Sequence, residues 1–338
     1  MTLTDHVLRQ RSVYRQTAKE VSKKRECVTD FNKKFASEHR KLQAVTFSFT
    51  QRVWARAVIA ISLIIIVYFY NKSQGRESTF ALAREHLTLR IQKFPCSSSY
   101  SKEMQEYPQC VPRNCGRFIA DKLIESKEVD VLQNLAENII NLAGGSKGGA
   151  SILDLHSGAL SQGDEFVNVY KMPQAMEFMK AEHLRIYRLV KDKIKLAIAD
   201  QFSIEPHSLH LTYPTFFSQL TNSSAESVHD EYWHEHVDKE TYPAFHYTSL
   251  LYLNTFNKDF KGGRFVFIDG SEENRTIFYI EPKKGRVSAF TSGEENRHHV
   301  EKVSGGTRFA LTISFTCDHK YAISDRKLDD ISSKTSLV

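Results

Sequence analysis

Residues 264–316 have the sequence RFVFIDGSEENRTIFYIEPKKGRVSAFTSGEENRHHVEKVSGGTRFALTISFT. Short runs of apolar and β-branched residues alternate in it with turn signals such as DGSEEN, PKKG, TSGEEN and SGG. Several short strands separated by regular turns are typical of a β-sandwich, a jelly roll or a barrel. The strands predicted in the C-terminal part of the chain are residues 209–213, 245–254, 264–268, 276–280, 286–290, 298–303 and 307–316.

Helical patterns precede these strands. A partly helical stalk is expected over residues 71–100, with ALAREHLTLRIQKF at 81–94, and the chain is expected to be helical again over 117–142. A long amphipathic helix is predicted from residue 172 or 173 to 200. Helices first and strands second indicate an α+β fold, with the helices packed on one outer face of the sheets.

Composition and charge narrow the classes of protein. The 338 residues are 41% hydrophobic and 25% charged, which excludes a collagenous, a disulfide-dense or a wholly disordered chain. Residues 1–52 hold 12 Lys/Arg against 5 Asp/Glu, whereas the remaining residues hold 34 against 35. The tail therefore has a surplus of +7 and the rest a balance of −1, so the net charge of +6 belongs to a basic tail. Because the body of the chain is nearly neutral, no nucleic-acid partner is predicted.

One segment is apolar enough to cross a membrane. Residues 54–70 have the sequence WARAVIAISLIIIVYFY, in which Arg56 is the only charged residue. A bilayer span needs about 17–25 residues, so residues 53–71 are predicted to form a transmembrane helix rather than a buried core helix. A cleaved signal peptide is disfavoured because a long segment precedes the run. The positive-inside rule then keeps residues 1–52 in the cytosol, and predicts a single-pass type II protein whose C-terminal part is lumenal or extracellular.

Cysteines and glycosylation sequons agree with that orientation. An even number of cysteines follows the span, and an oxidising compartment would permit two disulfides among them in any of three pairings. The four are Cys96, Cys110, Cys115 and Cys317, while Cys27 lies on the cytosolic side. Sequons occur at Asn71, Asn222 and Asn274. Asn71 abuts the predicted membrane, so glycosylation is predicted at Asn222 and Asn274.

Histidine is concentrated in the strand-rich part, where six of the 14 histidines lie between residues 229 and 299. His236 and Asp238 are separated by one residue, and on an extended strand residues i and i+2 point to the same face. A third ligand would come from His298 or His299. Two histidines and one carboxylate on one face form the ligand set of non-haem Fe(II) oxygenases.

Five motifs occur in an order and spacing known from one protein family. They are HVD at 236–238, LLYLN at 250–254, FKGGRFVFID at 260–269, EPKKGRVSAFTSG at 281–293 and HHVEKVSGGTRFALTISF at 298–315. Over approximately residues 165–318 the chain resembles the 2-oxoglutarate- and Fe(II)-dependent dioxygenases of the prolyl 4-hydroxylase-like group. The resemblance implies a double-stranded β-helix, a jelly-roll or cupin-like domain, with packing helices.

The resemblance also implies roles for individual residues. His236, Asp238 and His298 match the three iron ligands; His299 is the alternative to His298, but it alternates to the opposite face of the strand. Arg308 matches the residue that binds the distal carboxylate of 2-oxoglutarate, and Tyr252 matches a tyrosine whose hydroxyl often contacts that carboxylate. Fe(II), 2-oxoglutarate, O₂ and L-ascorbate are the implied cofactors. No catalytic residue beyond the metal ligands is expected.

The expected function follows from these parts. A membrane-anchored dioxygenase would hydroxylate a prolyl or lysyl side chain of a protein in the secretory pathway, in the endoplasmic reticulum or Golgi, and convert 2-oxoglutarate to succinate and CO₂. The alternatives are a catalytically inactive lumenal binding domain on the same scaffold, and a scaffold whose basic tail attracts anionic lipids. The expected segments are a basic tail (1–52), a span (53–71), a stalk and helical region (72–164), the dioxygenase domain (165–320) and a C-terminal tail (321–338).

Overall fold

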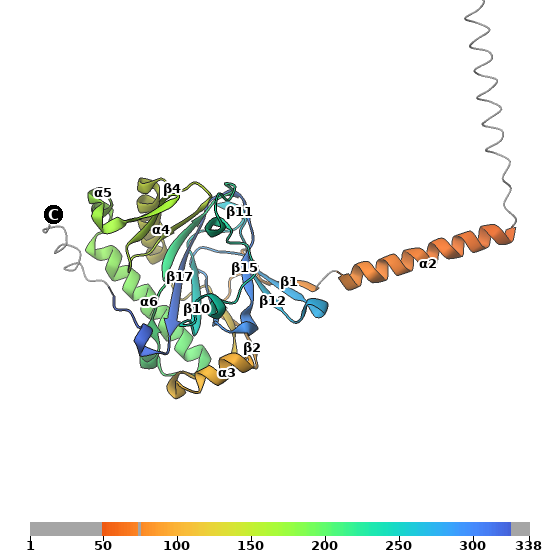
Figure 1. Cartoon of the computed structure of the whole chain (residues 1–338), viewed down its shortest axis with the longest axis horizontal. Helices are drawn as coiled ribbons and strands as arrows, with labels where there is room; N and C mark the ends of the chain where they lie inside the picture. The colour runs from red at the N-terminus through yellow and green to blue at the C-terminus, as the bar shows by residue number, and fades with distance from the viewer. Residues whose placement is uncertain (1–48, 74–75, 326–338) are drawn as a thin grey trace, which may run out of the picture. The chain divides into compact units, whose positions relative to one another are not determined.

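The computed structural model describes residues 49–73 and 76–325, which belong to two compact units. In the first unit, helix α2 (Phe49–Ser73) contains the apolar segment expected to span a membrane, and it is long and apolar enough to do so. The basic tail, Cys27 and the end of the C-terminal tail lie outside the described residues, and so do the side chain and sequon of Asn71. The rest of this description concerns the second unit (Figure 1).

The larger sheet forms the centre of the second unit. Its middle strand β10 (Tyr247–Tyr252) is buried along its whole length and pairs antiparallel with β14 (Val287–Thr291) and β17 (Arg308–Thr316). Both faces of β10 are covered, which is why its sequence YTSLLY lacks charged residues. The remaining strands are β2 (Arg90–Phe94), β3 (Cys115–Ala120), β4 (Gly145–Ser146), β5 (Ala150–Leu153), β6 (Ala159–Gly163), β7 (Glu165–Asn168), β8 (His210–Leu211) and β9 (Phe216–Leu220).

A smaller sheet lies against the C-terminal strands of the larger one. It has the order β1 (Arg76–Ala81), β13 (Thr276–Ile280), β12 (Phe265–Asp269) and β15 (His298–Val300). A separate pair joins β11 (Phe260–Gly262) to β16 (Val303–Gly306). One apolar cluster contains residues of both sheets, including Phe265 and Phe267 of β12, Tyr252 of β10 and Phe290 of β14. This cluster encloses the end of the molecule where the candidate site is found.

Helices pack together beside the larger sheet, where α4 and α6 are visible in Figure 1. Leu132 and Ile139 of α4 share a second apolar cluster with Val190 and Ile194 of α6 and with inward residues of the larger sheet. The helices of this unit are α3 (Ser98–Met104), α4 (Ser126–Ala143), α5 (Pro173–Phe178), α6 (Ala181–Phe202) and α7 (Asp238–Thr241). Single 3₁₀ turns occur at Pro108–Cys110, Val169–Lys171, Pro206–Ser208, Val228–Asp230, Glu272–Asn274, Glu294–Asn296 and His319–Tyr321.

The structure corrects several predicted elements. The expected helical stalk is wrong: residues 90–94 form β2, and residues 76–120 contribute three strands to the two sheets. The expected helix over 117–142 begins as β3 and becomes helical only at Ser126, where Glu125 and Glu128 form a capping box. The long helix predicted to end at residue 200 is divided into α5 and α6, and the strands β4–β7 and β9 were not predicted.

The structure contains two disulfides, which decide among the three possible pairings of the four cysteines. Cys96 pairs with Cys115, and Cys110 pairs with Cys317. The second bridge joins the 3₁₀ turn Pro108–Cys110 to the segment immediately after β17, so it closes a loop of 207 residues. The two predicted glycosylation residues, Asn222 and Asn274, are both exposed.

Candidate metal centre

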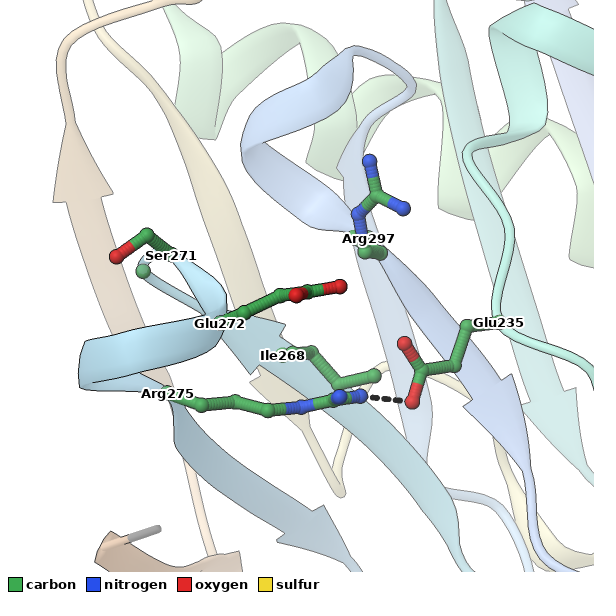
Figure 2. A pocket seen from close by; sticks show the side chains of 7 residues that line it. Glu235, Ile268, Ser271, Glu272, Arg275 and Arg297 are labelled. Carbon is green, nitrogen blue, oxygen red and sulfur yellow. Dashed lines mark hydrogen bonds and ion pairs between the residues drawn. The ribbon is translucent and has the colours of Figure 1, made fainter.

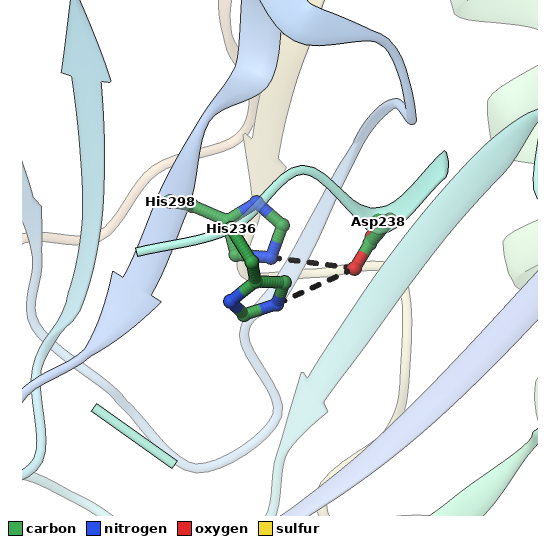
Figure 3. Close-up of side chains that lie close together, drawn as sticks. All are labelled: His236, Asp238 and His298. Atoms are coloured by element: carbon green, nitrogen blue, oxygen red, sulfur yellow. Dashed lines mark ion pairs between the residues drawn. The ribbon is translucent and has the colours of Figure 1, made fainter. Parts of the chain in front are cut away.

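Two histidines distant in sequence face each other across a short antiparallel bridge. The backbone N–H of His236 donates to the carbonyl of His298 at 2.9 Å, and the reverse bond has the same length. Residues directly opposite in an antiparallel pair project to one face, so both imidazoles lie on the same side and their ring centroids are 4.4 Å apart. Figure 3 shows the two rings with Asp238.

Asp238 completes the cluster from the first residue of α7. Its Oδ1 lies 3.6 Å from Nε2 of His236 and 3.5 Å from Nε2 of His298. The three ligand atoms lie within 4.8 Å of one another, and this is the one such group of three found among the residues that the structure describes. The one-residue spacing of His236 and Asp238 predicts that a continuous strand brings both side chains to one face. The chain instead turns into a helix at Asp238, which still leaves the carboxylate beside both rings.

Hydrogen bonds orient each ligand atom toward the shared space. Nδ1 of His236 lies 3.0 Å from the carbonyl oxygen of His234, and Nδ1 of His298 lies 2.8 Å from that of Asn296. Because a carbonyl oxygen only accepts, both rings carry their proton on Nδ1 and keep the Nε2 lone pair free. Such a bond is the usual partner of a metal-binding histidine.

The carboxylate of Asp238 is held in a similar way. Oγ1 of Thr248 donates to its Oδ2 at 2.6 Å, which leaves Oδ1 directed at the two rings. Oγ of Ser292 lies 2.9 Å from the Thr248 hydroxyl and continues this network. Sequence reasoning missed Thr248 and Ser292, because nothing in the motif marks a hydroxyl ten residues after Asp238 as its neighbour.

Burial and charge shift the pKa values of the two histidines in opposite directions and favour an ionised aspartate. Burial lowers the pKa of His298 to about 4, despite the opposing effect of Asp238. Burial would raise the pKa of Asp238, but His298, His236 and the Thr248 hydroxyl outweigh it, and the net direction is downward. For His236 the burial effect is outweighed by Asp238 and the His234 carbonyl, so its pKa is raised.

Apolar rings surround His298. The ring centroids of Phe265, Phe290 and Phe267 lie 4.9, 5.0 and 6.1 Å from that of His298. His299, the alternative ligand, projects to the other face of β15 and does not join the cluster. Two imidazoles with Nε2 directed at the shared space and one carboxylate form a donor set that suits a divalent iron ion. The residues present therefore fit the metal that the sequence resemblance implies.

A buried cation without an ion-pair partner in the described part of the chain lies on the face of the larger sheet that carries Thr248. Arg308 of β17 is 1% exposed, and its Nε donates to the carbonyl of Gly263 at 2.9 Å. Its Nη2 is buried and has no hydrogen-bond partner among the described residues, and the same is true of the hydroxyl of Tyr252. The Arg308 guanidinium carbon lies 5.6 Å from the Tyr252 ring centroid. Burial lowers the pKa of Arg308, and neither residue has a carboxylate beside it in the described structure.

The sheet register connects these two groups. Thr248 and Tyr252 are four residues apart on β10 and therefore project to one face. Tyr252 is paired with Ala310 of β17, so these two side chains project to the same face. Arg308 precedes Ala310 by two residues on β17, so its side chain also projects to this face. A buried guanidinium with an unused donor favours an anion that can accept two parallel bonds. The face thus carries a candidate divalent-metal site near Thr248 and a candidate carboxylate site near Tyr252.

Comparison with known proteins gives a consistent family. Residues 220–316 match the family model described as the 2OG-Fe(II) oxygenase superfamily. The chain is 47% identical over 278 residues to "2-oxoglutarate and iron-dependent oxygenase domain-containing protein 3" of Xenopus tropicalis, covering 81% of this chain and 86% of that protein. The human protein of that name is 46% identical over 282 residues, again with 81% and 86% covered.

More distant similarities include hydroxylases. Prolyl 3-hydroxylase 1 of Gallus gallus is 27% identical over 234 residues, which cover 64% of this chain and 31% of that protein. Among solved structures, a prolyl hydroxylase of Trichoplax adhaerens, in complex with a peptide fragment of hypoxia inducible factor, has 16% identity and a TM-score of 0.40, covering 68% of this chain and 98% of that one.

Proposed function

Because this chain belongs to the 2OG-Fe(II) oxygenase superfamily, we propose that it is an active 2-oxoglutarate-dependent dioxygenase that hydroxylates a prolyl or lysyl side chain of a protein. The observation that carries the proposal is the unpaired, buried Arg308 guanidinium on the same sheet face as the triad of candidate metal ligands. Together the two features would allow one face to hold both a metal ion and 2-oxoglutarate. The hydroxylases among the more distant relatives support an amino-acid side chain as the substrate.

We assign each residue a role in holding the cofactors. His236, Asp238 and His298 are the proposed ligands of Fe(II), through the three atoms that converge. Arg308 and Tyr252 are the proposed partners of the distal carboxylate of 2-oxoglutarate, because each has a buried polar atom without a partner. O₂ is the co-substrate. L-ascorbate is proposed only as the reductant that keeps the iron divalent.

The protein's own contribution is orientation, charge and the exclusion of water. The bound Fe(II) would supply the oxygen chemistry, in which O₂ is the oxidant and 2-oxoglutarate the two-electron co-reductant, so that succinate, CO₂ and a hydroxylated product would be formed. Thr248 holds the Asp238 carboxylate in one orientation, and the Gly263 carbonyl fixes the Arg308 side chain. Phe265 and Phe290 pack on His298 and keep water from its buried face.

The wider architecture is also part of the proposal. The antiparallel strands β10, β14 and β17, facing β12, β13 and β15, support a double-stranded β-helix. We propose that α2 anchors the chain in a membrane as a type II protein, with the second unit in the lumen of the endoplasmic reticulum or Golgi. The two disulfides support an oxidising compartment. There the exposed Asn222 and Asn274 would carry glycans, and the substrate would be a protein of the secretory pathway. We propose the same boundaries for the tail, the span, the stalk and helical region, and the dioxygenase domain that the sequence predicts.

The test is succinate release by the full chain in detergent with Fe(II), 2-oxoglutarate and ascorbate. Wild-type protein is expected to form succinate slowly without a peptide substrate, and Asp238→Ala is expected to lose this activity. Asp200→Ala, at an exposed acid on α6, is the matched control and should leave the rate unchanged. Equal succinate release by Asp238→Ala would refute the metal site. Binding of metal and 2-oxoglutarate without turnover would instead identify an inactive binding domain.

A further inference from the structure

A charged pocket lies directly behind the candidate metal ligands. Glu235 and Arg297 each precede a ligand histidine, and alternation along the His236–His298 bridge sends their side chains to the face opposite the imidazoles. The pocket has a volume of about 250 Å³ (Figure 2). Its lining residues are Glu235, Ile268, Gly270, Ser271, Glu272, Arg275 and Arg297. It is smaller than the roughly 300–1,000 Å³ typical of pockets that enclose a whole ligand, so it suits a single side chain.

The cations of this pocket have unused hydrogen-bond donors. Arg275 forms an ion pair with Glu235, yet its Nε is buried and has no partner. Arg297 is exposed, and its guanidinium has no ion-pair or hydrogen-bond partner in the described part of the chain. In Figure 2 the Arg297 guanidinium stands apart from the Glu235–Arg275 pair. Of the two acids that line the pocket, Glu235 is paired with Arg275, whereas Glu272 has no ion pair in the described part of the chain, so Arg297 and Glu272 are the two groups that compete for a charged ligand.

The sheet makes the pocket rigid. Ile268 forms its buried floor, and the N–H of Ile268 donates to the carbonyl of Arg297 at 2.9 Å. The turn that carries Glu272 and Arg275 begins at Gly270, whose φ is +86° and where a Cβ would lie 2.5 Å from the Asn274 carbonyl oxygen. Arg297 and Arg275 therefore come from fixed backbone on neighbouring segments. The guanidinium group of an arginine matches the geometry of a carboxylate and can bind it through two parallel hydrogen bonds.

We propose that this pocket binds an acidic side chain of the protein substrate, close in sequence to the residue that is hydroxylated. The assignment rests on the proposed dioxygenase function, because it takes the substrate peptide to pass the metal at His236. The Cα atoms of Glu235 and His236 are neighbours about 3.8 Å apart, so the pocket lies within the reach of a few residues of extended peptide from the candidate metal ligands. Arg297 supplies the main contact to the carboxylate, and Arg275 Nε adds a second donor.

The experiment uses short unstructured peptides with a central proline or lysine and flanking positions varied among Glu, Gln and Lys. Full-length protein in detergent is loaded with Mn(II) and 2-oxoglutarate, and the peptides it retains are identified by mass spectrometry. Wild type is expected to enrich Glu over Gln at one flanking position. Arg297→Ala should reduce that enrichment about tenfold, and Arg297→Glu should turn it into a preference for Lys. Arg185→Ala, at an exposed arginine of α6, is the matched control.

The outcomes separate this proposal from the proposed function. Succinate release without peptide reports the dioxygenase alone, whereas the enrichment is measured with Mn(II) and needs no turnover. Equal retention of the Glu, Gln and Lys peptides by wild type would overturn the acidic subsite. A Lys preference that Glu272→Gln removes would also overturn it, because the pocket would then take a basic residue. Glu enrichment that survives in Arg297→Ala would show that the acid binds elsewhere.

Discussion

Replacing Arg308 by methionine should stabilise the protein in the absence of 2-oxoglutarate and abolish its response to 2-oxoglutarate. The guanidinium is buried and one of its nitrogens has no partner. An uncompensated buried ion costs several kcal/mol, whereas the single bond to Gly263 contributes about 1 kcal/mol. The balance predicts a gain of about 1–3 kcal/mol, because methionine fills a similar volume without a charge.

A second buried arginine provides the contrast. Arg286 is also fully buried, but its Nε donates to Asp121 at 2.7 Å and its other nitrogens bond to carbonyl oxygens of the chain. Arg286→Met would leave the Asp121 carboxylate without its main partner, which typically costs about 3–5 kcal/mol. The two substitutions are chemically identical, so opposite signs would report the different surroundings of the two guanidinium groups.

Thermal unfolding of the metal-loaded full chain, with and without 2-oxoglutarate, measures both effects. For a body of this size the melting temperature changes by about 2–4 °C per kcal/mol. Arg308→Met should melt higher than wild type without 2-oxoglutarate, and Arg286→Met lower. Loss of the partner of a buried carboxylate costs about 2–5 kcal/mol, so the affinity of Arg308→Met for 2-oxoglutarate should fall at least thirtyfold. The reasoning is refuted if Arg308→Met destabilises the protein like Arg286→Met, or if 2-oxoglutarate still stabilises it.

Three further outcomes are expected. Gly263→Ala should destabilise the protein by about 1–2 kcal/mol, because Gly263 has a φ of +64°. It should also raise the KM for 2-oxoglutarate, because a Cβ there would lie 3.0 Å from Cδ of Arg308. An unchanged KM would contradict the idea that Gly263 positions Arg308. Thr248→Val removes the hydroxyl that bonds to Asp238 and should weaken metal binding about 10–100-fold in a Mn(II) titration, and wild-type affinity would show that the bond is dispensable. The free energy of unfolding should fall as the pH is lowered from 7 to 5, because burial lowers the pKa of five described histidines, among them His246. Below about pH 6.5 the unfolded chain therefore binds protons that the folded protein excludes, and the raised pKa of His236 opposes this effect only in part. A denaturation midpoint that does not change between these pH values would argue against this prediction.

Local patterns predicted the parts of the candidate site that lie close together in the chain. The apolar segment within α2 and the strands near 247–252, 276–280, 287–291 and 308–316 were recognised, because turn residues and runs of apolar residues are properties of neighbouring residues. The same holds for the one-residue spacing of His236 and Asp238. The inference that these two residues share a face was correct in outcome, although a helical turn at Asp238, not a continuous strand, produces it.

Elements assigned from weak patterns were less successful. Residues 90–94 and 115–120 contain charged and aromatic residues in no clear period, and they become strands only because β14 offers β3 a pairing edge and β3 offers one to β2. Arg117 of β3 illustrates the reason: its buried guanidinium is neutralised by Asp269, which is 152 residues away. No local property of the sequence announces such a partner.

The sequence by itself therefore determined the family, the membrane-span candidate, most strands of the C-terminal part of the chain and the residue types of the candidate metal cluster. All of these are recorded in composition, spacing or motif order. Only the tertiary structure decided that His298 rather than His299 meets Asp238, that Cys110 pairs with Cys317, and that Arg308 is buried with an unused donor. Each of these depends on distances between segments far apart in the chain, and such distances arise only when the sheets pack and close the core.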